Sequence, residues 1–500
     1  MSKIPLAKAD LSWFRMDDPT NRMIITGTMT LGAPINFAQL KTIIQTKLLR
    51  YRKFRQRIVV TGRLRKRYYW QDDPNFNIDD HLVPIELPEP KNQTVLQNFI
   101  SETLAYGLEY SRPLWRIYFV EEYNGGSAVI FRFHHVIADG ISLMHVLLSA
   151  ADNSPEPSAV LTKYSPAPPV KSSIIEHSMQ DLAGAVNSSK KTFEKIGAIG
   201  SRVKENPELI GEYIKLGLDT TLAAGRLIVR PPDPDSQFNG SLGLTKKAAW
   251  SNGIPLDDIK SLAKVYGATV NDVLISLIAG ALRGYILERY DSIDYDNFSS
   301  FIPVNLRPIE LSENLGNEFG LVVLTLPINE EHAIDRLYKS KYQMDSLKSS
   351  REAIATYGII NLLGMVPAKL QYIGAKFLDT KGTIVITNVP GPQEQLYLAG
   401  APIDSIMAWV PQSSSIGLGI SIISYNKCVW IGVASDERLV PDPELVVNFF
   451  EQELETLKEL ASQHLEKRHA PYEPLFRELQ QTLDALDEAL DHQAVEPPQD

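Results

Sequence analysis

Hydrophobic positions along the chain follow two spacings, one typical of strands and one typical of helices. Residues 128–133 (AVIFRF) are apolar almost throughout, which predicts a buried strand, and helical spacing follows at 141–151. Helical spacing also predicts helices at 256–266 and 271–290. Further strands are predicted at 301–304, 321–326, 382–387, 417–425 and 429–434. This mixture predicts an α/β or α+β fold built in layers.

Proline-rich segments divide this pattern into units. Residues 152–173 hold five prolines, and 231–235 (PPDPD) form a second break. The segment between them has helical spacing and few β-branched clusters, so we expect a helical connector. The predicted units are an N-terminal lobe at 1–152, a linker and connector at 153–236, a C-terminal lobe at 237–470, and an acidic tail at 471–500.

Composition and charge exclude several classes of protein. Apolar residues make up 44% of the chain and charged residues 22%, as in soluble globular proteins. The net charge is -10, but residues 471–500 hold eight acids and one Arg, which leaves -3 for the other 470 residues. The single cysteine, Cys428, excludes an internal disulfide framework and lies in a strand pattern, so we expect it in the core. The start of the chain lacks the apolar segment of a signal peptide, and we expect a cytoplasmic protein.

The strongest chemical signal is the segment 134–140, HHVIADG. Neighbouring side chains on a strand face opposite ways, so His134 and His135 cannot both reach one reacting atom. Asp139 is spaced to fold back beside the second histidine, and we expect Gly140 to allow a conformation or a close approach that a side chain would block. An imidazole can take a proton from an alcohol near neutral pH. The competing interpretation is two buried histidines that only satisfy hydrogen bonds in the core.

This segment resembles the HHxxxDG signature of CoA-dependent acyltransferases, which include chloramphenicol acetyltransferase and the condensation domains of peptide synthetases. Other segments narrow the resemblance to the bacterial wax ester synthase/diacylglycerol acyltransferase family, in family order from about Leu11 to Phe450. These segments are Pro113-Leu114-Trp115, Asn271-Asp272, Leu315-Gly316-Asn317, 387–392 (TNVPGP), Ser424-Tyr425, Asp436 and 440–442 (VPD).

The resemblance implies two chloramphenicol-acetyltransferase-like lobes with the active site in a tunnel between them. It implies transfer of a fatty acyl group from acyl-CoA to a long-chain alcohol, which gives a wax ester, or to diacylglycerol, which gives triacylglycerol. No covalent intermediate, cofactor or metal is implied, because acyl-CoA is itself a substrate. It also implies peripheral contact with the inner face of the membrane or with lipid droplets.

The resemblance assigns roles to individual residues. His135 would be the general base, His134 would be structural or secondary, and Asp139 would hold the local architecture, often through an arginine. Arg50 and Arg55 are candidate partners of Asp139 by position.

The remaining motif residues have two interpretations each. Pro113, Leu114 and Trp115 would shape the acyl-binding wall, or simply begin a buried strand. Asn271 would orient a substrate, or cap a helix with Asp272 in its first turn.

A basic stretch at 47–67 holds ten Lys or Arg and no acid. It fits solvated faces of a helix end and hairpin, or a site for CoA phosphates or anionic lipid. Nucleic acid is disfavoured because the whole chain is acidic.

Two further functions compete with the wax ester or triacylglycerol reaction. One is a related acyltransferase with another acceptor, such as a glycolipid or a short alcohol. The other is a non-catalytic protein that binds lipid surfaces, which would not need both His135 and Asp139.

Overall fold

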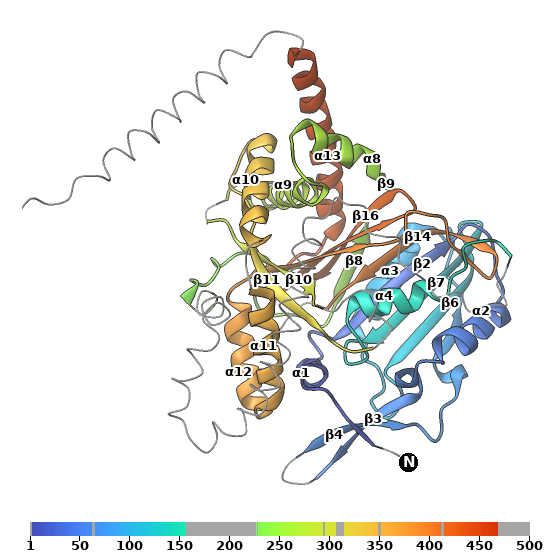
Figure 1. The fold of residues 1–500 in the computed structure, drawn as a ribbon. Coiled ribbons are helices and arrows are strands. Elements are labelled where there is room, and N and C mark those ends of the chain that lie inside the picture. The colour runs from blue at the N-terminus through green and yellow to red at the C-terminus, as the bar shows by residue number, and fades with distance from the viewer. Residues whose placement is uncertain are drawn as a thin grey trace, which may run out of the picture.

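A computed structural model describes residues 3–62, 66–156, 227, 229–293, 296–306, 315–348, 352–411 and 415–468. The predicted connector lies almost entirely outside the described residues, and the acidic tail at 471–500 lies wholly outside them. The described residues form two α/β lobes side by side, so the predicted fold class is confirmed (Figure 1).

The first lobe is built on a six-stranded sheet, at the right of Figure 1. Two of its central strands are buried along their whole length. Across the sheet, the strands are β13 (Tyr397–Leu398), β14 (Ala401–Trp409), β2 (Ile24–Leu31), β7 (Gly126–His134), β6 (Trp115–Tyr123) and β5 (Leu82–Ile85). The helices of this lobe are α1 (Lys8–Met16), α2 (Phe37–Ile43), α3 (Gln93–Ala105) and α4 (Gly140–Leu148).

The second lobe is built on a seven-stranded sheet. Its strands are β11 (Phe319–Thr325), β10 (Ser299–Asn305), β12 (Ile384–Pro390), β15 (Leu418–Tyr425), β16 (Cys428–Asp436) and β8 (Lys246–Trp250), with β9 (Ile254–Pro255) also paired to β16. The five strands predicted in this region are therefore confirmed, with small shifts in their ends. Cys428 begins β16 and is half-buried.

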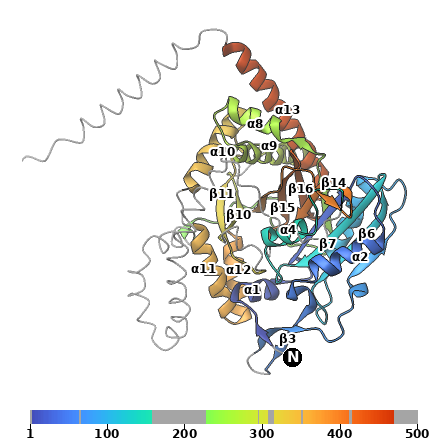
Figure 2. The same ribbon diagram turned by 45° about the vertical axis from the view of Figure 1, so that its right-hand side comes forward.

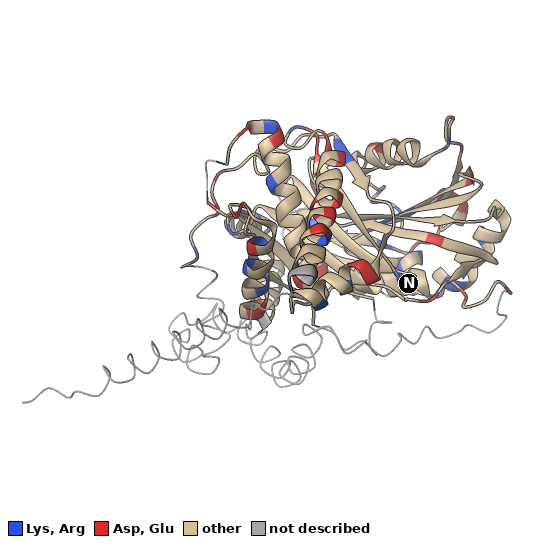
Figure 3. Cartoon of the chain, turned by 90° about the horizontal axis from the view of Figure 1, so that it is seen from above, with Lys and Arg blue, Asp and Glu red and all other residues tan. Residues whose placement is uncertain are grey.

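Helices cover the second sheet in two groups that Figures 1 and 2 show apart. The first group surrounds α9, which contacts its neighbours on three sides. It comprises α8 (Leu256–Val265), α9 (Val270–Tyr290), α10 (Ala333–Lys348) and α13 (Pro443–Arg468). The second group is a hairpin of α11 (Glu352–Met365) and α12 (Ala368–Asp379), which lies beside α1. Charged residues lie mostly on the helices and loops and are sparse on the strands (Figure 3).

Helix α9 is the one described helix whose length and composition would allow it to cross a membrane. Of the apolar 18-residue stretch within this helix, 72% is buried inside the protein, as expected of a core helix. A capping box between Thr269 and Asp272 begins this helix.

The two lobes exchange elements, so the predicted boundaries at 152 and 237 do not separate them cleanly. Strand β14 comes from the range assigned to the second lobe but pairs with β2 in the first sheet, where Trp409 lies opposite Thr26. In return, α1 leaves the first lobe and contacts α11. A small sheet of β1 (Ile4–Pro5), β4 (Arg67–Asp72) and β3 (Gln56–Thr61) lies below (Figure 1). Each lobe therefore completes the other.

Candidate active site

A cavity with about 1300 Å³ of empty space, its mouth included, lies between the lobes. His135, Asp139 and Gly140 line it from the first lobe. Most of its remaining wall is apolar and comes from β10, β11, β12, α11 and α12. This apolar part includes Phe301, Leu321, Ile360, Leu363, Leu378 and Val385. Such a wall fits a hydrocarbon chain better than a polar substrate.

The two histidines face opposite ways, as the strand geometry predicts. His135 lines the cavity, whereas His134 packs behind it, where its Nδ1 accepts a hydrogen bond from the Val136 amide at 3.0 Å. Backbone bonds from both residues fix this position: the His134 amide donates to Leu114 and the His135 amide to Met23. Only His135 can therefore contact a ligand in the cavity.

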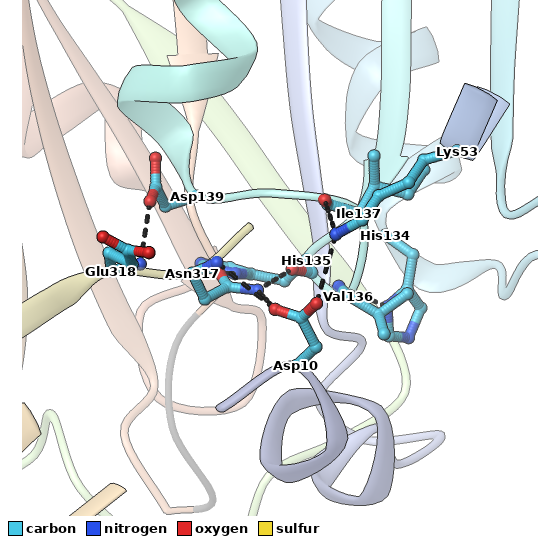
Figure 4. A network of polar contacts seen from close by, with 9 residues as sticks. All are labelled: Asp10, Lys53, His134, His135, Val136, Ile137, Asp139, Asn317 and Glu318. Atoms are coloured by element: carbon cyan, nitrogen blue, oxygen red, sulfur yellow. Dashed lines mark hydrogen bonds and ion pairs between the residues drawn. The ribbon is translucent and has the colours of Figure 1, made fainter. Parts of the chain in front are cut away.

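Asn317 determines which nitrogen of His135 carries a proton (Figure 4). The Asn317 amide nitrogen contacts the Asp10 carboxylate at 2.9 Å and the His135 carbonyl at 2.8 Å. Both groups accept only, so this atom must be the donating nitrogen. The Asn317 oxygen therefore faces His135 Nδ1, at 2.7 Å, and that nitrogen must donate. The remaining lone pair of the neutral imidazole lies on Nε2.

A cation anchors the far end of this chain of hydrogen bonds. Lys53 donates to Asp10 at 3.1 Å and to the Ile137 carbonyl at 2.9 Å. Asp10 is buried, and its second oxygen accepts from both the backbone and the side chain of Asn317. The carboxylate is thus paired and hydrogen-bonded, which a buried charge requires.

Burial keeps both histidines neutral near neutral pH. Removal from water lowers the pKa of His134 to about 4. Burial also lowers the pKa of His135, although the nearby Asp139 charge and the Asn317 hydrogen bond act in the opposite direction. A neutral imidazole is the form that can accept a proton.

Asp139 joins the two lobes rather than contacting His135 directly. One carboxylate oxygen caps α4 by accepting from the Ser142 amide at 2.8 Å, and the other accepts from the Glu318 amide at 3.2 Å. The Asp139 amide in turn donates to the Gly316 carbonyl.

The predicted arginine partners lie elsewhere. Arg50 donates to the Tyr51 hydroxyl, and Arg55 lies near Asp72. Asp139 accepts hydrogen bonds from the backbone amides of Ser142 and Glu318.

Gly140 differs from the expectation. Its φ is not positive, and an added Cβ would meet no atom within 4 Å. Because Gly140 lines the cavity, its missing side chain leaves space there.

The structure places the predicted acyl-binding residues outside this cavity. None of Pro113, Leu114 and Trp115 lines the cavity. Trp115 is buried in the core of the first lobe, where its indole donates to the Phe54 carbonyl at 2.8 Å. The alternative interpretation, the start of a buried strand, is the one observed. This strand pairs with β7 and so supports the histidines from behind.

Asn271 and Asp272 lie one layer away from the cavity. Thr269, not Asn271, caps α9, and Asp272 completes the capping box. Asn271 accepts a hydrogen bond at 2.7 Å from Asn388, which does line the cavity. Asn271 can therefore orient a cavity residue, but it does not itself line the cavity.

Three cations of the basic stretch form ion pairs within the protein. Lys47 is buried against Asp152 at 2.8 Å, Arg52 pairs with Asp72, and Lys53 pairs with Asp10. The charges of these three cations are therefore already paired within the first lobe.

Sequence reasoning missed the role of Asn317 and the participation of Asp10 and Lys53. Asn317 was recognised only as part of a family motif, and its place beside a strand start gave no role. Lys53 was hidden in the basic stretch. Only the folded chain brings residues 10, 53, 135 and 317 together.

Two family models cover most of the chain. The wax ester synthase/diacylglycerol acyltransferase catalytic domain matches residues 6–274, and the WS/DGAT C-terminal domain matches residues 315–458. The second match begins at the segment that holds Asn317.

Curated relatives are distant but long. A probable diacylglycerol O-acyltransferase of Mycobacterium tuberculosis is 23% identical over 385 residues, which cover 75% of this chain and 77% of that protein. A putative diacylglycerol O-acyltransferase of Mycobacterium bovis is 24% identical over 485 residues, covering 91% of this chain and 90% of that protein.

Solved structures share the fold. The wax ester synthase/diacylglycerol acyltransferase from Marinobacter aquaeolei VT8 has a TM-score of 0.65 at 20% identity, covering 92% of this chain and all of that one. The first condensation domain of the calcium-dependent antibiotic synthetase, in complex with a substrate analogue, has a TM-score of 0.58 at 15% identity, covering 92% and 96%. The two-lobed arrangement is common to both.

Proposed function

Because the chain belongs to the wax ester synthase/diacylglycerol acyltransferase family, we propose that it moves a fatty acyl group from acyl-CoA to a long-chain alcohol or diacylglycerol, with His135 as general base. The observation that carries this proposal is the hydrogen-bonded state of His135 at the end of the apolar cavity. Its Nδ1 donates to Asn317, so Nε2 holds the lone pair that can accept a proton.

The reaction needs one proton relay and no covalent enzyme intermediate. His135 Nε2 takes the proton from the acceptor hydroxyl as its oxygen attacks the thioester carbon. The carbon–sulfur bond then breaks, and the imidazolium returns the proton to the departing CoA thiolate. The Asp139 charge favours the protonated ring, so it stabilises this ion pair during transfer.

The lining of the cavity supports a long acyl chain as substrate. Leu321, Leu363 and Leu378 belong to three different elements and all line the cavity. Burying methylene groups against such a wall is worth about 0.8 kcal/mol each. Acyl-CoA and a lipid acceptor are thus the substrates that the cavity fits best.

The test is release of free CoA by purified protein from palmitoyl-CoA, with hexadecanol or diacylglycerol as acceptor. We expect acceptor-dependent release that falls at least ~100-fold in His135→Gln, the size typical of a lost general base. His332→Ala is the matched control, because His332 is exposed on the surface. Extraction of the ester product then identifies the preferred acceptor.

Two results would contradict the proposal. Equal rates in wild type and His135→Gln would remove His135 from the chemistry. Absence of release with either acceptor, but release with a glycolipid or a short alcohol, would move the protein to the related acyltransferase considered above.

A further inference from the structure

The hairpin of α11 and α12 exposes more large apolar side chains than its size explains. Leu370, Tyr372 and Ile373 are 55%, 58% and 56% exposed. Leu362, Met365 and Phe377 on the same two helices are also exposed. Single exposed hydrophobic residues are ordinary, but a contiguous group on one element marks an interaction surface.

The same two helices are apolar on their inner side. Ile360 and Leu363 of α11 and Leu378 of α12 line the cavity, while Gln371 and Ala375 are buried. Helices with large apolar side chains on both the inner and the outer face normally contact protein or lipid on both faces. Here the inner face contacts protein and the outer face contacts none of the described residues closely enough to be buried.

The charges of this face complement an anionic lipid surface. The two helices carry Lys369 and Lys376, and their two acids, Glu352 and Asp379, lie at the ends of the hairpin and are not exposed. Both lysines are exposed beside the apolar side chains, and Lys376 lies over the Tyr372 ring at 5.1 Å. Basic residues that flank apolar ones are typical of helices that lie in the plane of a membrane interface.

We propose that the outer face of the α11–α12 hairpin docks on an anionic phospholipid surface. Docking would place the cavity wall within about one helix diameter, ~10 Å, of the lipid. A lipid acceptor could then leave the surface beside the hairpin and reach His135 with little exposure to water. This last step rests on the proposed function, whereas the docking itself does not.

Vesicle co-sedimentation of the full chain tests the docking. With vesicles of phosphatidylcholine and phosphatidylglycerol, Leu370→Asn/Ile373→Asn should lower the partition coefficient at least ~10-fold. Lys369→Gln/Lys376→Gln should lower it roughly 5-fold per lysine, and the effect should vanish on phosphatidylcholine alone. The control is Leu244→Asn/Tyr290→Asn, which removes two exposed apolar side chains elsewhere on the surface.

Several results would overturn this proposal. Wild type that does not sediment with the vesicles would do so, as would an equal loss in the control pair. A wild-type dimer that dissociates in Leu370→Asn/Ile373→Asn would assign the face to self-association. Because the assay contains no substrate, its failure leaves the CoA-release test of His135 untouched.

A separate observation concerns Trp13. Its indole nitrogen is buried and has no acceptor among the described residues, although its ring lines the cavity. The ring stacks on His135 with centroids 4.4 Å apart. Three hydroxyls on the same wall already have acceptors: Ser12 donates to Ile360, Thr356 to Leu321 and Thr387 to Ser421. Trp13 thus carries a donor without a protein acceptor on a ring that stacks on His135 and lines the cavity.

The geometry points to the Trp13 indole N–H as a donor to the oxyanion of the tetrahedral intermediate, a role that rests on the proposed function. When the acceptor oxygen adds to the thioester carbon, the carbonyl oxygen becomes negative and needs a donor that is already in place. A donor held beside His135 before the reaction costs no reorganisation. Trp13 is then a catalytic residue rather than only a stacking platform.

Trp13→Phe removes the N–H and keeps an aromatic ring on His135. We expect kcat to fall about 100-fold, with KM for palmitoyl-CoA nearly unchanged. The packing control is Phe14→Leu, which alters the next aromatic ring of α1, does not line the cavity and leaves the N–H in place. Equal losses in both variants, or full activity in Trp13→Phe, would overturn the role. If His135→Gln is inactive while Trp13→Phe is active, only the oxyanion role fails.

Discussion

Replacing Asn317 tests the arrangement that makes His135 a base. Asn317→Ala removes the acceptor of the His135 Nδ1 proton and the two hydrogen bonds that hold the amide in place. The tautomer of His135 with its proton on Nδ1 then loses the hydrogen bond that favours it. In the other tautomer Nε2 carries the proton and cannot accept one.

The size of the effect follows from burial. His135 is 5% exposed, so water cannot replace the lost acceptor well. Leaving a buried donor unpaired costs about 1–3 kcal/mol. At 1.36 kcal/mol per tenfold change, this predicts a kcat lower by roughly 5- to 150-fold. KM should change less, because Asn317 does not line the cavity.

Asn317→Asp separates positioning from folding. A carboxylate in this place would face both His135 Nδ1 and the Asp10 carboxylate. Its charge would raise the pKa of His135, so the acidic limb of the kcat profile should move to higher pH. Loss of the hydrogen bond in Asn317→Ala should not raise it, because that bond itself raises the pKa. A purely structural residue would not produce opposite shifts.

The assay is CoA release across a pH series, with melting temperatures for each variant. Asn36→Ala is the control, since it removes the capping box of α2 without touching the cavity and should cost about 1 kcal/mol of stability. The reasoning is refuted if folded Asn317→Ala keeps kcat within threefold of wild type, or if Asn36→Ala loses as much activity.

Two further predictions concern residues behind the cavity. Trp115→Phe should lower the free energy of unfolding by about 2 kcal/mol, because it leaves the Phe54 carbonyl without its donor. The KM for palmitoyl-CoA should stay within twofold of wild type. A raised KM would restore the interpretation of Trp115 as part of the acyl-binding wall. Burial lowers the pKa of His134 to about 4, so below the unfolded pKa of 6.5 the unfolded state binds more protons and the protein loses stability as the pH falls. The variant His134→Asn keeps an acceptor for the Val136 amide, and in denaturant titrations it should remove about 2 kcal/mol of the difference in the free energy of unfolding between about pH 7 and pH 5. An unchanged difference would contradict the buried neutral state.

Local pattern was enough to predict most strands of the second sheet but not the exchange between lobes. Strand β15 is apolar at most positions, so the spacing of its apolar residues and the turn residues beside it are enough to predict a strand. Strand β14 begins with Ala401 and Pro402 and carries the exposed Asp404, which weakens the apolar pattern. Its partner β2 is almost 400 residues away in the sequence, and nothing local specifies that pairing.

The motif segments show a similar limit for the site. HHVIADG indicated the chemistry because adjacent strand positions must face opposite sides, and the structure places His135 in the cavity and His134 behind it. The PLW segment carried no such geometric rule, and its family association suggested a wall that Trp115 does not form.

The network around His135 explains why the two lobes must be assembled before the base is set. Asp10 comes from α1, Lys53 from the first lobe, and Asn317 from the segment that leads into β11 of the second lobe. Asp139 adds two backbone bonds to the same segment, at Gly316 and Glu318. Separating the lobes would therefore remove the acceptor of the Nδ1 proton as well as the apolar wall. The tautomer of His135 and the shape of the cavity depend on the same interface, so catalytic competence and acyl binding should be lost together when that interface opens.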